Sequence, residues 1–253
     1  MAVNGNCHIC GRACLLSFEH VPPRAAFNDR QMILTPGDRL IGMDLDRPRG
    51  QVRQGGAGGY TLCRDCNSNT GAWYGRAFVE WTYQARIVLD RALGQPAVHN
   101  AYRIHPLRVL KQVLCMFFSA NGPGFAPKNE ELVRLVLNKE ARGLPPQYRV
   151  YAFFNTSQRA RQTGIYGKLT GGEPHVGSEI AFPPLGYLMT FESAPPAGLA
   201  DISFMADAAY NEERDVLLTL PLLPVYTYLP GDYRDRETAR RDAERNRREW
   251  WGK

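Results

Sequence analysis

The clearest periodicity along the chain is an apolar residue at every fourth position, which predicts a long amphipathic helix over 70–94. The residues that carry this spacing are Trp73, Ala77, Trp81, Ala85, Leu89 and Leu93. Two further helices are predicted, over 105–120, where leucines and phenylalanines share one face, and over 129–141, which opens on the capping residue Asn129. Residues 1–62 are weakly periodic and rich in Gly, Pro and Arg, which indicates loops and short strands.

From Tyr148 the pattern changes to short β-rich runs separated by Gly and Pro. These runs predict strands over 149–155, 164–169, 178–182, 187–192, 202–205, 216–220 and 225–229. The last segment, about 233–250, carries Glu–Arg pairs at i,i+4 and predicts a basic terminal helix. The pattern therefore predicts an α+β protein with a small unit over 1–95 and a mixed α+β unit with a mostly antiparallel sheet over 96–253.

Composition and charge narrow the range of partners. The chain has 253 residues, of which 44% are hydrophobic and 22% charged, and these values exclude wholesale disorder. The net charge of +6 lies at the two ends, because 101–233 is neutral. A basic surplus favours a polyanionic partner, although genomic base composition explains an arginine excess equally well. No apolar run is long enough for a membrane span and no signal-peptide pattern is visible, so we expect a cytoplasmic protein without membrane contact.

Four of the six cysteines form two Cys-x-x-Cys pairs, Cys7/Cys10 and Cys63/Cys66. In a reducing compartment such pairs are more often metal ligands than disulfides, and two of them supply the four thiolates of a tetrahedral zinc site. The second pair runs directly into the predicted helix. This order of knuckle and helix predicts a treble-clef-like module with a structural zinc.

Between the pairs, an acid stands next to a histidine, Glu19-His20, just before Pro22. Neighbouring side chains on a strand point to opposite faces, so both residues reach one site only if the chain bends there, as the proline allows. Asn67 follows the second pair directly. Carboxylate and amide oxygens are hard ligands of the kind that bind Mg²⁺, and a neutral histidine is a base near neutral pH. These three residues are therefore candidates for one metal-dependent site.

The motifs occur in the order Cys7-x-x-Cys10, Glu19-His20-x-Pro22 and Cys63-x-x-Cys66-Asn67-x-x-x-Gly71. Over about 7–75 this order resembles the zinc-containing HNH endonucleases of the ββα-metal fold. The resemblance implies an HNH endonuclease that hydrolyses phosphodiester bonds in DNA, in phage defence or restriction. It also implies His20 as general base, Glu19 and Asn67 as ligands of a catalytic Mg²⁺ or Mn²⁺, and the four paired cysteines as ligands of a structural Zn²⁺.

The expected partner is double-stranded DNA, and a homodimer is compatible with the sequence. Five arginines are candidates for phosphate contacts, which give affinity without sequence choice: Arg24, Arg49, Arg53, Arg64 and Arg76. The chain departs from the family pattern in having Glu-His for Asp-His, Thr70 where many members have Lys, and Gly58 where many have an Asn that braces the loop. These departures favour an alternative, a catalytically inactive zinc-stabilised module that binds nucleic acid or protein. A third interpretation is a nuclease directed at RNA.

Overall fold

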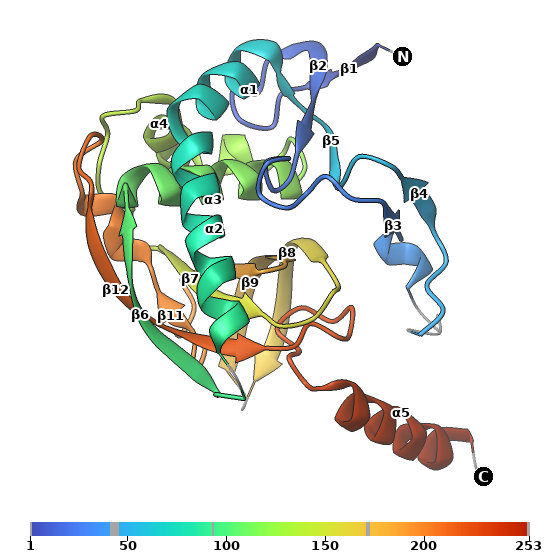
Figure 1. Cartoon of the computed structure of the whole chain (residues 1–253). Coiled ribbons are helices and arrows are strands. Elements are labelled where there is room, and N and C mark those ends of the chain that lie inside the picture. The colour runs from blue at the N-terminus through green and yellow to red at the C-terminus, as the bar shows by residue number, and fades with distance from the viewer. Residues whose placement is uncertain (1, 41–45, 93, 171–172, 252–253) are drawn as a thin grey trace.

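A computed structural model describes residues 2–40, 46–92, 94–170 and 173–251 and confirms a mixed α+β fold with a mostly antiparallel sheet (Figure 1). The strands are β1 (Val3–Asn6), β2 (Ala13–His20), β3 (Met32–Leu34), β4 (Gln51–Arg53), β5 (Gly58–Cys63), β6 (Ala97–Ile104), β7 (Tyr148–Asn155), β8 (Arg161–Thr170), β9 (Glu173–Phe182), β10 (Leu185–Phe191), β11 (Ala200–Asp201) and β12 (Arg214–Leu223). The helices are α1 (Arg64–Thr70), α2 (Arg76–Arg91), α3 (Pro106–Ala120), α4 (Glu130–Leu137) and α5 (Arg236–Trp251). Shorter helical turns are η1 (Gly37–Arg39), η2 (Gly71–Gly75), η3 (Ala126–Lys128) and η4 (Ser203–Asp207).

The N-terminal part is a small antiparallel sheet in the order β1-β2-β5, followed at once by α1. Strands β2 and β5 pair from Leu16 opposite Cys63 to His20 opposite Gly58. A register shift between Ser17 and Phe18 interrupts this pairing, and β-bulges of this kind often lie next to active sites. The long connection between β2 and β5 carries the hairpin β3–β4, which projects from the body in Figure 1.

The predicted helix over 70–94 exists but begins earlier and is interrupted. Cys63 is the N-cap of α1, because its Sγ accepts a hydrogen bond from the Cys66 amide in the first turn. The π-helical turn η2 then connects α1 to α2, which ends at Arg91. The buried apolar residues of α2 follow the four-residue spacing that predicted the helix, with Ala77, Trp81 and Ala85 on the covered face.

The large sheet has the order β6-β12-β7-β10-β9-β8, and β11 pairs with the middle of β7 at Tyr151 and Ala152. Its one parallel pairing among the described strands joins β12 to β7. Helix α3 is buried along almost its whole length and contacts β8 and β9, while α2 lies against β6 (Figure 1). Helix α3 matches the predicted 105–120 closely because Pro106 opens it and its leucines and phenylalanines fill the core.

Two predicted strands are wrong. The run over 202–205 forms the turn η4, since Asp201 Oδ1 accepts from the Ser203 amide and starts a helical turn there. The run over 225–229 is also not a strand, although Val225 and Tyr226 are buried. Its carbonyl groups accept hydrogen bonds from the side chains of Ser157, Arg159 and Arg161 in place of a neighbouring strand.

The predicted boundary near residue 95 coincides with the start of β6, which belongs to the large sheet. One hydrophobic core nevertheless runs through both parts, from Ile9 and Leu62 through Trp81 to α3 and the large sheet. The two units thus share one interior, and the boundary itself stays a prediction. No helix in the described ranges is long and apolar enough to cross a membrane.

Candidate metal centre and catalytic cleft

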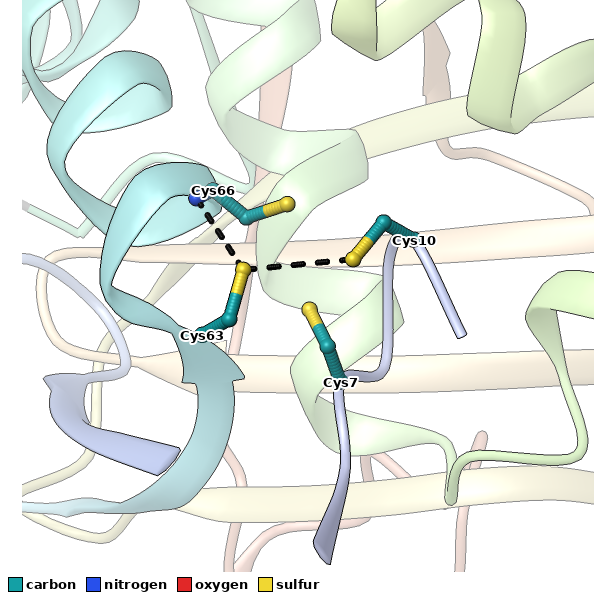
Figure 2. Close-up of side chains that lie close together, drawn as sticks. All are labelled: Cys7, Cys10, Cys63 and Cys66. Atoms are coloured by element: carbon teal, nitrogen blue, oxygen red, sulfur yellow. Dashed lines mark hydrogen bonds between the residues drawn. The ribbon is translucent and has the colours of Figure 1, made fainter. Parts of the chain in front are cut away.

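Two chain segments bring the four paired cysteines together (Figure 2). Cys7 and Cys10 lie on the loop after β1, Cys63 ends β5, and Cys66 lies in the first turn of α1. Their sulfur atoms all lie within 4.8 Å of one another, and Cys10 Sγ is 3.9 Å from Cys63 Sγ. The cysteine cluster can therefore hold a metal ion.

The spacing of the sulfurs fits tetrahedral zinc in particular. A Zn–S bond of about 2.3 Å places two thiolates of a tetrahedral site about 3.8 Å apart, close to the Cys10–Cys63 separation. Without a cation, the hydrogen bond with Cys7 and burial both raise the pKa of Cys66. Four ionised sulfurs at this distance require a positive charge between them, so metal binding and proton release are coupled at this cluster.

Arg12 supplies positive charge beside the cysteine cluster. Its Nε lies 3.5 Å from Cys10 Sγ and its Nη2 lies 3.8 Å from Cys63 Sγ. The same guanidinium donates to Asp65 Oδ2 at 3.0 Å, which fixes its orientation. Four thiolates with one Zn²⁺ carry a net charge of −2, and Arg12 offsets part of it. No motif in the sequence singles out Arg12, although it stands two positions after Cys10.

A second feature is a cleft of about 620 Å³ between the end of β2, the helical run from α1 to α2, and α3. Glu19, His20 and Asn67, the three residues predicted to act together, all line it. Arg24 and Arg76 line the same cleft. The structure therefore gathers the predicted catalytic residues and two of the predicted phosphate-binding arginines around one space.

The other three predicted arginines lie away from the cleft lining. Arg49 precedes β4, Arg53 ends it, and Arg64 is the first residue of α1. All three side chains are exposed. Their contact with nucleic acid stays a prediction.

Glu19 is the most buried of the cleft's ionisable groups, with 7% of its surface exposed. Its Oε2 accepts hydrogen bonds from Thr61 Oγ1, at 3.1 Å, and from Ser119 Oγ of α3. Burial raises the pKa of Glu19 to about 7, against the opposing effect of these two hydroxyls. Both bonds use Oε2, and Oε1 makes no hydrogen bond with the described residues.

His20 and Asn67 each use one side-chain nitrogen in hydrogen bonds to the protein. His20 Nε2 lies 3.0 Å from the backbone oxygen of Gly55, which selects the tautomer with its proton on Nε2 and leaves Nδ1 as a proton acceptor. Asn67 Nδ2 donates to Ser17 Oγ at 3.1 Å and to the Phe18 carbonyl at 3.2 Å. The amide oxygen of Asn67 is thereby left for another ligand.

Asn28 braces this end of the sheet, and the sequence analysis missed it. Its Nδ2 donates to the backbone oxygens of Pro22 and Ala57, and its Oδ1 accepts from the Ala57 amide. An asparagine at Gly58 is excluded sterically, because a Cβ there would overlap the backbone oxygen of Glu19. Asn28 therefore braces the chain at Ala57, which lies far from it in the sequence. No local spacing of residues indicates this contact.

Comparisons of the chain with protein-family models, with curated proteins and with solved structures return no match.

Proposed function

We propose that this chain is a metal-dependent endonuclease of the HNH type, which hydrolyses phosphodiester bonds in nucleic acid at the cleft between β2 and α1. The observation that carries the proposal is the joint position of Glu19, His20 and Asn67 on that cleft. Each of them uses only one of its polar side-chain atoms in hydrogen bonds with the described residues. In this proposal the cysteine cluster binds a structural Zn²⁺ that fixes the start of α1 and, with it, Asn67.

His20 acts as the general base. Its Nε2 proton is engaged by Gly55, so Nδ1 takes the proton from the attacking water, and protein contacts hold the ring in this orientation. The Phe18 ring packs edge-on against His20 at 5.0 Å between centroids and limits its rotation. Base catalysis by one positioned side chain contributes roughly 10²–10⁴-fold to a rate.

Glu19 Oε1 and the Asn67 amide oxygen would hold a Mg²⁺ or Mn²⁺ ion. When bound, this ion supplies positive charge for the phosphate group and the leaving oxygen. Glu19 must give up its proton to serve as a ligand, and the hydroxyls of Thr61 and Ser119 stabilise the resulting carboxylate. Arg24 and Arg76 add phosphate contacts at the same cleft.

The test is cleavage of a plasmid and of single- and double-stranded DNA and RNA by the zinc-loaded protein. Reactions with Mg²⁺, with Mn²⁺ and with a chelator of divalent metals are compared for the wild type, for Asn67→Ala and for the control Asn69→Ala, which changes an exposed asparagine of α1. We expect cleavage that requires the added metal and that Asn67→Ala alone reduces. Absence of cleavage with every substrate and metal would refute the proposal.

A second candidate is a zinc-stabilised nucleic-acid-binding module without catalysis. It is favoured by the burial of Glu19, which holds a proton up to about pH 7 and resists metal binding below that pH. Salt-dependent binding of nucleic acid without cleavage would support this alternative. A role in phage defence or restriction would follow from the nuclease proposal only through the family resemblance, and it stays a prediction.

A further inference from the structure

We propose that Gln112 binds the base edge of an unpaired nucleotide next to the bond that is cut. This inference rests on the proposed nuclease function and adds its substrate class, a strand that presents at least one unpaired nucleotide. Gln112 is assigned here as a substrate-positioning residue. It belongs to α3, the central helix of the large unit, and it lines the same cleft as Glu19 and His20.

The first observation is an unpaired polar atom. Gln112 is 4% exposed, and its Oε1 is buried without a hydrogen-bond partner among the described residues. Other buried polar groups of α3 are paired, since Lys111 Nζ donates to Asn138 O and Ser119 Oγ donates to Glu19. An unpaired buried amide oxygen destabilises the folded protein, because it gives up its bond to water without replacement. A ligand that pairs with this amide would remove that cost and explain its position.

The second observation is the glycine-lined wall in front of Gln112. Gly71 and Gly75 open and close the π-helical turn η2, and both line the cleft. A Cβ at Gly75 would come to 3.9 Å from Gln112 Oε1, so a larger side chain there would extend over the amide. Turns of this helical type are frequent at functional sites. Gly75 therefore places no side chain between Gln112 and the cleft that both residues line.

Two arginines of the cleft would bind the phosphate of the same nucleotide. Arg24 and Arg76 line the cleft, and Arg76 keeps an ion pair with Glu80 at 2.8 Å that orients its guanidinium. A nucleotide with its phosphate at the arginines and at Glu19 and Asn67 would direct its sugar and base toward Gln112. An amide both donates and accepts hydrogen bonds, which matches the Watson–Crick edge of a base.

The depth of Gln112 then selects an unpaired nucleotide. A cleft of about 620 Å³ is of the size that encloses a small ligand. The base edge that Gln112 would bind is occupied by the partner strand in a duplex. A paired nucleotide must therefore leave the stack, and the free-energy cost of doing so is smallest for a strand that is already single. The cleft should accordingly favour single strands, bulges and frayed ends over a matched duplex.

The experiment measures binding, so it does not depend on cleavage. Fluorescent oligonucleotides, either a single strand, a duplex with one bulged nucleotide or the matched duplex, are titrated with zinc-loaded protein at fixed salt, with Ca²⁺ present instead of Mg²⁺. The wild type is compared with Gln112→Leu and with the control Gln162→Leu, which changes an exposed glutamine of β8. Urea unfolding of each variant reports the structural effect of the substitution.

We expect the wild type to prefer the single strand and the bulge. Gln112→Leu should bind both about tenfold more weakly, which corresponds to one lost hydrogen bond, while its matched-duplex affinity stays unchanged. It should unfold at the same or a higher urea concentration, because the unpaired amide is gone, and Gln162→Leu should behave as the wild type. If Gln112→Leu does not fold, Gln112→Met provides the same comparison with an unbranched side chain of similar length.

Equal single-strand binding by the wild type and Gln112→Leu would overturn the Gln112 proposal, and so would an equal loss on single strand and duplex. These outcomes leave the nuclease proposal intact, because that proposal is judged by metal-dependent cleavage. A wild type that binds none of the three oligonucleotides would overturn both.

Discussion

Asn28 and Ala57 are joined by two hydrogen bonds that run in opposite directions. Asn28 Nδ2 donates to the Ala57 carbonyl at 2.7 Å, and the Ala57 amide donates to Asn28 Oδ1 at 2.6 Å. A third bond, from Asn28 Nδ2 to the Pro22 carbonyl at 2.6 Å, ties the chain just after His20 to the same side chain. The end of β2 and the start of β5 are thereby held in register where the cleft begins.

Replacing Asn28 by Ala should destabilise the fold and the cleft together. Asn28 is fully buried, so the change removes the partners of the Pro22 carbonyl and the Ala57 amide, while the Ala57 carbonyl keeps its bond from the Val21 amide. We expect a loss of about 2–4 kcal/mol in the free energy of unfolding, measured with urea. The control is Asn69→Ala, on the exposed face of α1, which should stay within about 0.5 kcal/mol of the wild type. An Asn28→Ala protein as stable as this control would show that the brace is dispensable.

The cysteine cluster should bind one zinc ion per chain. Cys66→Ser removes a ligand from the buried side of the cluster, and we expect elemental analysis to find almost no zinc in the purified variant. Cys14→Ser is the matched control, because Cys14 lies outside the cluster and its Sγ donates to the Arg12 carbonyl. A full zinc content in Cys66→Ser would contradict the assignment.

Arg12→Ala should weaken zinc binding without removing a ligand. The guanidinium lies beside two of the four sulfurs and offsets the negative charge of the loaded site. Loss of such an outer contact lowers metal affinity by roughly 10–100-fold, which competition with a chromophoric chelator measures. Arg30→Ala, an exposed arginine elsewhere in the N-terminal part, should leave the affinity unchanged. If both variants release zinc as the wild type does, the charge of Arg12 plays no part.

Lys111 gives a pH dependence of stability with a definite sign. Burial lowers the pKa of Lys111 from 10.5 to about 8 in the folded protein, where its Nζ donates to the carbonyls of Asn138 and Lys139. Between these two values the unfolded chain still holds a proton that the folded protein has released. The free energy of unfolding should therefore increase as the pH rises from about 8 to 10.5. The same contribution is lost when the pH falls back through about 8.

The comparison variant for this prediction is Lys111→Met, which keeps the length of the side chain without its amine. The difference in free energy of unfolding between the wild type and Lys111→Met should change in favour of the wild type as the pH rises from about 8 to 10. Urea unfolding at several pH values measures this difference. A constant difference would mean that the pKa of Lys111 is not lowered.

Local patterns predicted the parts of the molecule that local interactions determine. The two Cys-x-x-Cys pairs brought four sulfurs together as expected, and the apolar spacing of α3 gave its bounds almost to the residue. Both features depend on residues a few positions apart. The pairing of Glu19, His20 and Asn67 around one cleft also followed from motif order, because β2, β5 and α1 are adjacent in the fold.

The parts that the sequence did not predict depend on contacts between distant segments. Asn28 bonds to Ala57 and Ser119 bonds to Glu19 across long stretches of chain, and no spacing rule links such pairs. The apolar run over 225–229 has the composition of a strand, but arginine and serine side chains occupy its carbonyls. The sequence also gave no indication of Gln112 as a site residue, because its neighbours on α3 are those of a core helix.

His20 is the proposed base of the cleft, and single-turnover cleavage by His20→Ala tests this role most directly. The control is His99→Ala, an exposed histidine of β6 bonded to Thr219. With equal zinc content and equal urea stability, we expect His20→Ala to cleave roughly 10²–10⁴-fold more slowly than the wild type and His99→Ala to match it. Equal rates for the wild type and His20→Ala would contradict the account.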